Sequence, residues 1–190
     1  MVAGLERDKT SENSIDIKVM IGIWISGMEY KENANQVEDA VKLANVYPNI
    51  VQVISCGNEI IGLPGSDIFV CDKSKIIGYL NDMKQRTNVP VTINDIYFEW
   101  TDDYYRDVVD VLDFITIHIY RQWPNITLEN TLAYINEVIH DLQQKFPHKE
   151  IVIGETSWTT SKNSGQFGPV ADESSQMQFY EACQQWSATS

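Results

Sequence analysis

The sequence predicts an α/β protein of the (β/α)8 TIM-barrel type, of which about five β/α units are visible. Short apolar runs alternate with longer segments whose apolar residues recur at helical spacing. Apolar strands separated by helices indicate parallel β–α–β units in which helices cover the sheet. Polar residues follow the apolar runs directly, and this is where a barrel builds its active site.

The expected strands are short runs rich in Ile and Val, which favour buried parallel strands. The first, over residues 17–25, reads IKVMIGIWI and is followed by a helical pattern. The others are expected at residues 50–55, 89–93, 113–119 and 150–153. Their spacing along the chain suits either a (β/α) barrel or a doubly wound sheet.

The expected helices have apolar residues three and four positions apart. The first covers residues 33–46 and places the apolar residues of QVEDAVKLAN on one face. The others are expected at residues 74–86, 103–112, 128–146 and 173–186. Pro48 follows the first helix and Pro147 ends the longest, because proline cannot continue a helix.

The barrel is favoured over the doubly wound sheet because no GxGxxG or GxxxxGK[ST] motif follows the first strand. Polar side chains instead follow each strand in turn, namely Ser26, Asn58 with Glu59, Asn94 with Asp95, His118 with Tyr120, and Glu155. A complete barrel needs about 250 residues. We therefore expect residues 17–190 to form part of a (β/α) barrel domain, preceded by a polar lead-in at residues 1–16.

Composition limits the partners. Asp and Glu number 27 against 14 Lys and Arg, so the formal charge is −13, which disfavours nucleic acid and anionic membranes. No apolar run is long enough to span a membrane, no signal peptide is visible, and no compartment is predicted. Cys56, Cys71 and Cys183 form no metal motif, so we expect no metal or cofactor. Buried free thiols are favoured, and pairing of Cys56 with Cys71 stays open.

Two glutamates, Glu59 in ISCGNEI and Glu155 in IVIGETSW, each follow an apolar run. They are three β/α steps apart, so in a barrel they face each other across the mouth. Glycoside hydrolysis needs such a pair, because one carboxyl group protonates the leaving oxygen while the other attacks or activates water. Gly57 and Gly154 would let the backbone pack closely at the strand ends. The alternative is two solvated acids that only end strands.

Four tryptophans, Trp24, Trp100, Trp123 and Trp158, lie at or just after expected strand ends. Aromatic rings in such places stack on the faces of sugars, so we expect Trp24, Trp100 and Trp158 to bind substrate. The alternative for each ring is packing between loops at the rim of the barrel.

The GNE and GETSW motifs, together with KVMIGIWIS and FITIHIY, resemble glycoside hydrolase family 17 in its bacterial and fungal branch. The likeness to this β-1,3-glucanase family covers about residues 17–180. It implies a retaining (β/α)8 glycosidase whose strands three to seven are the visible ones. Strands one, two and eight are then not visible in this sequence, so we expect open sheet edges and weak activity.

By this resemblance Glu59 is the acid/base and Glu155 is the nucleophile. The implied mechanism passes through a glycosyl-enzyme on Glu155, with the two carboxyl groups about 5–5.5 Å apart. Glu59 must then hold a proton near neutral pH, and the neighbouring charge of Glu155 would raise its pKa.

The resemblance also assigns binding roles. Asn58 corresponds to the residue that binds the 2-hydroxyl of the sugar, and Tyr120 to a hydroxyl that steadies the nucleophile. His118 and Trp158 would line the same subsite. The sequence departs from the usual motifs VGNE and GETGWPS at Cys56, at Ser157 and at residues 159–160, which alters the loop after the nucleophile rather than the nucleophile itself.

We therefore expect a retaining hydrolase of β-1,3-glucan-type polysaccharides. A glucan transglycosylase shares the first half-reaction and stays open. A second alternative is a non-catalytic carbohydrate-binding remnant. A third is an acidic assembly partner whose open edges are completed by a second chain through self-association, which a mass in solution above 21.7 kDa would indicate.

Overall fold

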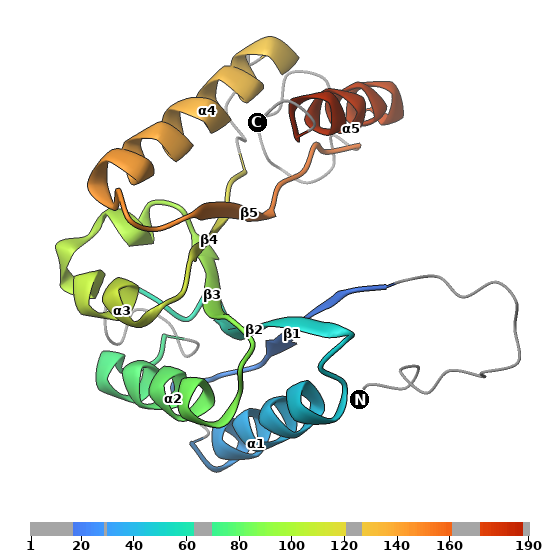
Figure 1. The fold of residues 1–190 in the computed structure, drawn as a ribbon. Helices are drawn as coiled ribbons and strands as arrows, with labels where there is room; N and C mark the ends of the chain where they lie inside the picture. Colours follow the sequence, from blue (N-terminus) through green and yellow to red (C-terminus); the bar gives the residue numbers. More distant parts are fainter. Residues whose placement is uncertain (1–16, 29, 63–69, 121–126, 161–171, 188–190) are drawn as a thin grey trace, which may run out of the picture.

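Five parallel strands form one sheet in the order β1-β2-β3-β4-β5 (Figure 1). The computed structural model describes residues 17–28, 30–62, 70–120, 127–160 and 172–187, so the expected lead-in at residues 1–16 lies outside the described residues. The strands are β1 (Val19–Ile23), β2 (Val51–Asn58), β3 (Val91–Ile96), β4 (Ile115–His118) and β5 (Ile151–Glu155).

Helices follow the strands in alternation. They are α1 (Tyr30–Val46), α2 (Lys73–Arg86), α3 (Arg106–Val111), α4 (Leu128–Lys145) and α5 (Glu173–Ser187). Each strand and helix expected from periodicity is present with small shifts at its ends. Among the differences, β2 runs on to Asn58, and before α3 the chain first forms the 3₁₀ turns η1 (Glu99–Thr101) and η2 (Asp103–Tyr105).

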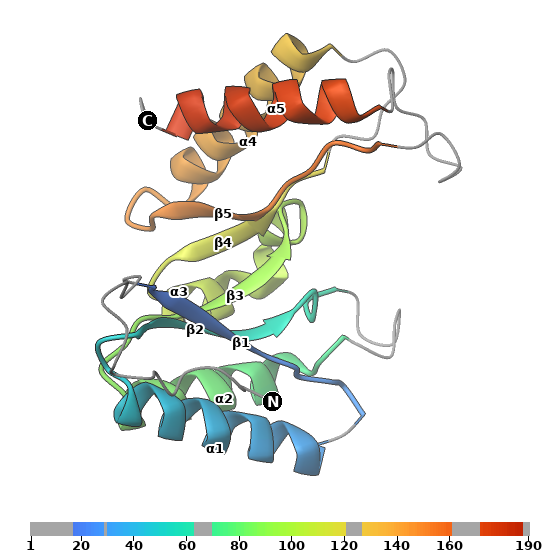
Figure 2. The same ribbon diagram turned by 90° about the vertical axis from the view of Figure 1, so that its right-hand side faces the viewer.

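The strand order distinguishes the barrel from the doubly wound sheet, the two fold classes that the spacing of the strands allows. In a doubly wound sheet the order reverses at a switch point, and helices cover both faces. Here each strand lies beside the next one in the chain and runs parallel to it. Figures 1 and 2 show α1 and α2 against one half of a curved sheet and α4 and α5 against the other half, all on its outer side. This is the barrel arrangement, and the predicted fold class is confirmed.

The core lies between this sheet and its helices. Ile54, Ile93 and Ile117 from the strands are fully buried, as are Ile76 and Leu80 of α2. Burial of such side chains contributes about 1.5–3 kcal/mol each relative to exposure. Asp72 is the N-cap residue of α2, and its side chain accepts hydrogen bonds from free N–H groups in the first turn of the helix.

Between the apolar residues, the strands carry small polar side chains that form hydrogen bonds with neighbouring strands. The hydroxyl groups of Thr92 and Thr116 lie 2.9 Å apart across β3 and β4. The backbone N–H of Asn94 donates to the hydroxyl of Ser55 on β2 at 3.1 Å. Because buried polar groups cost free energy when unpaired, these bonds make the polar layer compatible with a buried sheet.

The outer strands β1 and β5 are the edges of the sheet. On β1 the side chain of Met20 is 39% exposed. On β5 the three residues Ile151, Val152 and Ile153 are only partly buried, whereas Ile115 of the neighbouring β4 is fully buried. The expected open edges are therefore present in the described part of the chain. Within that part, no helix combines the length and the apolarity that a membrane span requires.

Trp100 corrects one sequence expectation. Its side chain is fully buried, and its indole Nε1–H donates to the carbonyl oxygen of Thr116 at 3.2 Å. The 3₁₀ turn η1 places the ring in the core instead of at the rim. Trp100 therefore has no exposed face on which a sugar could stack, and its assignment as a substrate-binding residue is wrong.

Replacing Trp100 by alanine is expected to lower the free energy of unfolding by about 3–5 kcal/mol, because a large buried ring is lost and Thr116 loses a donor. Trp24, whose side chain is 57% exposed, is the matched control, and Trp24→Ala is expected to change stability by less than about 1 kcal/mol. Urea denaturation of the two variants measures both values. Equal losses would contradict the assignment of Trp100 to the core.

Candidate active site

The end of β2 presents Glu59 through a strained backbone. Gly57 has φ 97°, and a Cβ added there would come within 2.6 Å of Cδ1 of Ile60, so glycine is required. Glu59 itself has φ 52°, in the left-handed region, where a side chain costs about 1–3 kcal/mol. Its backbone N–H donates to the carbonyl oxygen of Asn94 on β3 at 2.8 Å, which ties this turn to the next strand.

The end of β5 presents Glu155 beside β4. A Cβ on Gly154 would come within 2.6 Å of Cγ2 of Thr116, so glycine leaves the space that this neighbouring side chain occupies. In the strand pairing His118 lies opposite Glu155, after a register shift that follows Ile117. The close packing that the sequence predicted near both glutamates is therefore present at Gly57 and at Gly154.

His118 contacts both glutamates. Its Nδ1 lies 2.9 Å from Oε1 of Glu59, and its Nε2 lies 3.5 Å from Oε1 of Glu155. The imidazole is fully buried, whereas the two carboxylates are 44% and 46% exposed. The ring therefore lies beneath the pair, and the carboxylates face the solvent. Residues from β2, β4 and β5 thus meet at one point, although they are far apart in the sequence.

The contact between Glu59 and His118 can hold a proton in two ways. Either Nδ1–H donates to the carboxylate, or a protonated Glu59 donates to an unprotonated Nδ1. The Nε2 atom of His118 is buried and makes no hydrogen bond within the described part of the chain. Oε1 of Glu155 is within ion-pair distance of that atom. The arrangement therefore allows one proton to pass between Glu59 and the imidazole without leaving the site.

Tyr120 contacts the second carboxylate. Its hydroxyl donates a short hydrogen bond to Oε2 of Glu155, and its ring meets that of His118 edge to face, with centroids 6.4 Å apart. Burial, the hydrogen bond to Glu155 and the charge of that carboxylate all raise the pKa of Tyr120. The phenol therefore stays protonated and serves as a donor. Tyr120 therefore holds one oxygen of Glu155, and Nε2 of His118 lies 3.5 Å from the other.

The floor between β2 and β4 is formed by β3. Asn58 lies opposite Asn94 in the strand pairing, and Oδ1 of Asn94 is buried without a hydrogen bond in the described residues. The next residue, Asp95, is fully buried and accepts hydrogen bonds from the N–H groups of Ile61 at 2.9 Å and of Ile96 at 2.8 Å. Burial raises the pKa of Asp95 to about 7, although these two N–H groups oppose the rise.

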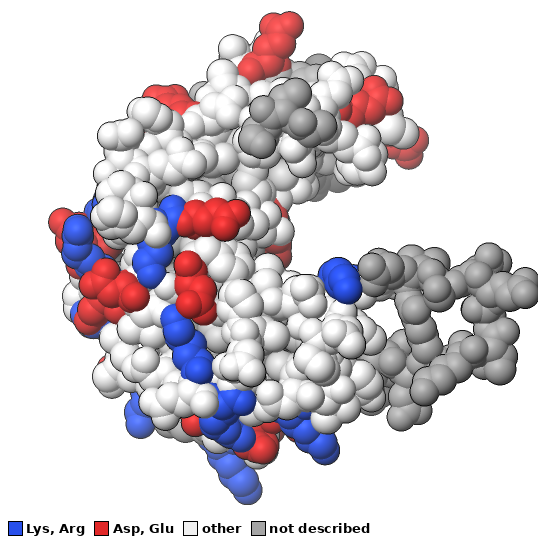
Figure 3. Space-filling model, viewed as in Figure 1, with Lys and Arg blue, Asp and Glu red and all other residues white. Residues whose placement is uncertain are grey.

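Figure 3 shows the surface notched between the half that carries α1 and α2 and the half that carries α4 and α5. Among the described residues, no group of three or more His, Cys, Asp or Glu side chains could hold a metal ion. Cys56, Cys71 and Cys183 are free thiols, which resolves the pairing that the sequence left open. Burial raises the pKa of Cys56.

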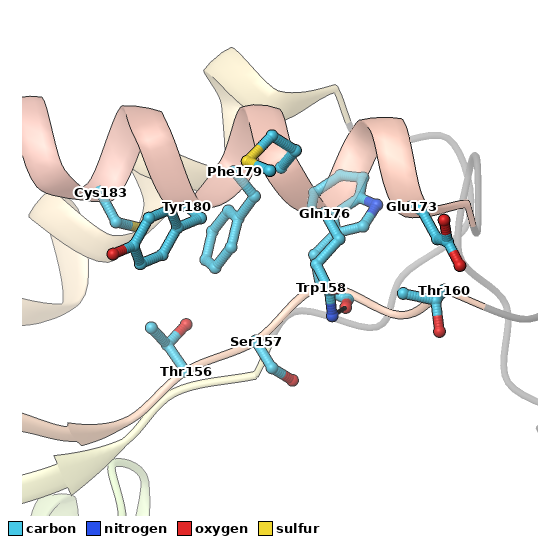
Figure 4. Close-up of a pocket in the computed structure, with 10 residues that line it drawn as sticks. Thr156, Ser157, Trp158, Thr160, Glu173, Gln176, Phe179, Tyr180 and Cys183 are labelled. Carbon is cyan, nitrogen blue, oxygen red and sulfur yellow. Dashed lines mark hydrogen bonds between the residues drawn. The ribbon is translucent and has the colours of Figure 1, made fainter.

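Trp158, three residues after Glu155, lies beside helix α5. Its ring packs against Phe179 of α5, with centroids 5.8 Å apart. It lines a cavity of about 630 Å³ between α5 and the segment after β5, in which neither Glu59 nor Glu155 takes part (Figure 4). That Trp158 and the buried His118 line one subsite stays a prediction. The exposed Trp24 follows β1, and Trp123 lies outside the described residues.

Sequence reasoning missed two residues that shape the turn after Glu59. The sequence predicts Asp95 only as a polar residue after a strand, and it predicts no role for Tyr105. The hydroxyl of Tyr105 accepts the N–H of Gly62 at 3.1 Å and donates to its carbonyl oxygen. The one available signal was an acidic residue inside the apolar run VTINDI, where a buried charge needs specific partners.

Two half-exposed carboxylates that meet at the strand ends of a barrel-type sheet are typical of glycoside hydrolases. The comparisons agree with this class. The model of the BtgE/BtgC glycoside hydrolase domain matches residues 10–190, so the chain belongs to this family. The comparison with curated proteins gives no match.

Solved structures with the same fold are also glycoside-acting enzymes. An endo-laminarinase from Formosa Hel1_33_131 has a TM-score of 0.77 and 18% identity, over 92% of this chain and 58% of that one. A family 17 β-1,3-glucanosyltransferase from Rhizomucor miehei has a TM-score of 0.64 and 21% identity, over 84% of this chain and 57% of that one. A β-glucuronidase from Lactobacillus rhamnosus has a TM-score of 0.56 and 18% identity, over 82% of this chain and 26% of that one. The chain thus spans less than two thirds of the length of each.

The raised pKa of Asp95 predicts a pH dependence of stability. The folded chain keeps this proton up to about pH 7, whereas the unfolded chain releases it near the ordinary value of 3.8. The folded state therefore binds more protons in this window, so the free energy of unfolding falls as pH rises from about 4 to about 7, by up to about 4 kcal/mol.

Asp95→Asn removes the titration, so the stability of the wild type relative to this variant should decrease across the same window. Urea denaturation at several pH values from about 4 to about 8 measures the difference. A difference that does not change with pH would contradict the raised pKa.

Proposed function

We propose that the chain is the catalytic part of a retaining glycoside hydrolase of the family 17 type that acts on β-1,3-glucan. The observation that carries the proposal is the contact of His118 with both Glu59 and Glu155. Two carboxyl groups that share one small bridging ring lie close enough to act on opposite sides of one glycosidic bond. Hydrolysis with retention of the anomeric configuration requires a separation of about 5–5.5 Å between the two carboxyl groups.

Glu155 is proposed as the nucleophile. The hydroxyl of Tyr120 and the Nε2 side of His118 hold its two oxygens, which orients the carboxylate. A lone pair on one oxygen attacks the anomeric carbon as the bond to the leaving sugar oxygen breaks, and a covalent glycosyl-enzyme forms. The steadying role expected for Tyr120 is supported by its hydrogen bond to Glu155.

Glu59 is proposed as the acid and then the base. It gives its proton to the leaving oxygen in the first step, and in the second it takes a proton from the water that attacks the glycosyl-enzyme. The hydrogen bond to Nδ1 of His118 supports this role, because the imidazole can hold or return the proton within the site. Since His118 is fully buried, we propose that it acts on the two carboxylates rather than on the substrate.

The substrate assignment draws on the structural neighbours. The laminarinase and the β-1,3-glucanosyltransferase share the fold, and an active-site mutant of the transferase was solved with laminaritriose at a TM-score of 0.60. We propose that Asn58, at the end of β2, binds the 2-hydroxyl of the sugar and that the exposed Trp24 stacks on a further sugar ring. Trp158, partly buried against α5, is proposed for a more distant sugar.

Hydrolysis and transfer share the glycosyl-enzyme on Glu155 and differ in the acceptor that reaches it. The neighbours include both a hydrolase and a transferase, so both outcomes are tested together. Chromatography of laminari-oligosaccharide digests separates them, because transfer lengthens the oligosaccharide and hydrolysis only shortens it.

Glu155→Gln is expected to lower the release of reducing ends from laminarin by about 10³–10⁴-fold, since the amide cannot form the glycosyl-enzyme. Glu150→Gln, an exposed change at the other end of the strand that carries Glu155, is the control and should leave the rate unchanged. Nuclear magnetic resonance of the first product should show the β-anomer.

Wild-type rates in the Glu155→Gln variant would exclude Glu155 as nucleophile, and an α-anomer as first product would exclude retention. A folded wild type that binds laminarin without cleaving it would favour the carbohydrate-binding alternative.

A further inference from the structure

We propose that Asp95 is a positioning residue that holds the backbone around Glu59 and so keeps its carboxyl group in place for catalysis. The inference rests on the proposed role of Glu59 as acid/base. It goes further by assigning a function to a buried residue that touches neither the carboxylates nor the substrate.

Asp95 binds the turn after Glu59 with one oxygen and its own strand with the other. Oδ2 accepts the N–H of Ile61 at 2.9 Å, and Oδ1 accepts the N–H of Ile96 at 2.8 Å. Ile61 is two residues beyond Glu59. A carboxyl group can accept at both oxygens, whether or not one of them carries a proton, whereas an amide has one acceptor oxygen and an NH₂ group that only donates. This double acceptance therefore needs an acid at residue 95.

Residues of β3 hold the chain on both sides of the Glu59 side chain. The N–H of Glu59 donates to the carbonyl oxygen of Asn94, and the N–H of Ile61 donates to Asp95. Between them, the carbonyl oxygen of Ile60 accepts the N–H of Cys71 at 2.9 Å. The backbone from Glu59 to Ile61 is thus bonded at three successive residues.

Tyr105 adds a second anchor beyond this segment. Its hydroxyl accepts the N–H of Gly62 and donates to the carbonyl oxygen of the same residue. The ring is almost fully buried, so this anchor is also fixed within the core. Residues 59–62 are therefore tied to rigid neighbours, although they follow the end of β2.

Such bonding is needed because Glu59 sits in the left-handed region with φ 52°, a conformation that persists only where the surroundings hold it. Its carboxyl group is half-exposed and meets His118 at Nδ1. If the bond from Asp95 to Ile61 were lost, relaxation of the turn would carry the carboxyl group away from His118 and from the glycosidic oxygen. A displacement of about 1 Å can cost about 100-fold in rate.

Asp113 provides a matched control for a purely structural role. Its Oδ2 accepts the N–H of Val91 at 2.7 Å, at the opposite end of the strand that carries Asp95. Asp113→Asn therefore weakens a comparable bond from a carboxylate to the backbone of β3, far from Glu59. It also removes an ion pair with Lys84, so it is not a milder change than Asp95→Asn.

The experiment compares Asp95→Asn and Asp113→Asn in the full chain, after near-ultraviolet circular dichroism has shown both to be folded. With laminarin as substrate, Asp95→Asn should lower kcat by about 10- to 100-fold and change KM by less than about twofold. Asp113→Asn should keep kcat within about twofold of the wild type. If Asp95→Asn does not fold, Tyr105→Phe takes its place, with a loss of kcat in the same direction.

Amide hydrogen exchange of Ile61 is the second measurement, and it does not depend on activity. Exchange should be faster in Asp95→Asn than in the wild type and unchanged in Asp113→Asn. Unchanged kcat in Asp95→Asn, equal losses of kcat in both variants, or unchanged exchange at Ile61 would each overturn the proposal. If the wild type cleaves no glucan, the proposed function fails, and exchange at Ile61 alone decides whether Asp95 holds the turn.

Discussion

Parallel pairing of consecutive strands is the constraint on which the site depends. Because all five strands run in the same direction, their carboxyl ends lie at one edge of the sheet. Two register shifts then set the final positions. One falls between Ser55 and Asn58 of β2, and the other between Ile117 and His118 of β4. Irregularities of this kind re-aim side chains, and here they place Asn58 beside Asn94 and His118 beside Glu155.

At this edge of the sheet, two carboxylates lie in contact with one buried imidazole. The chain carries a net charge of −13, yet the described side chains at the centre of the site include two carboxylates with one histidine and no lysine or arginine. The carboxylates stay in contact with solvent, whereas the ring that joins them is buried. A buried polar ring needs partners, and here Nδ1 has a hydrogen bond with Glu59 while Nε2 lies 3.5 Å from a carboxylate oxygen of Glu155. The site thus depends on His118 as much as His118 depends on the glutamates.

The fold could be predicted because it follows from local patterns. Apolar runs such as IVQVIS and the helical spacing of residues 33–46 are each contained in a short stretch of sequence. The strand order then follows, because connections between parallel strands are short and right-handed. Glu59 and Glu155 could be singled out because each directly follows such a run. Trp100 could not be placed in this way, since its position depends on the 3₁₀ turn η1, which folds it back over the sheet. Burial of His118 and the bonds of Asp95 depend on register and on a turn from another strand, and no local pattern contains them.

The strand order also has a consequence for how the chain assembles. Each β/α unit finds its neighbour among the residues that directly precede it, so the sheet can grow from β1 towards β5 as the chain leaves the ribosome. The pair of Glu59 and His118 can form once β4 has been added, but Glu155 arrives only with β5. A partly synthesised chain that ends before β5 would therefore hold four of the five described strands and one of the two carboxylates. The pair of Glu59 and Glu155 is complete only when β5, the last strand of the described sheet, has joined.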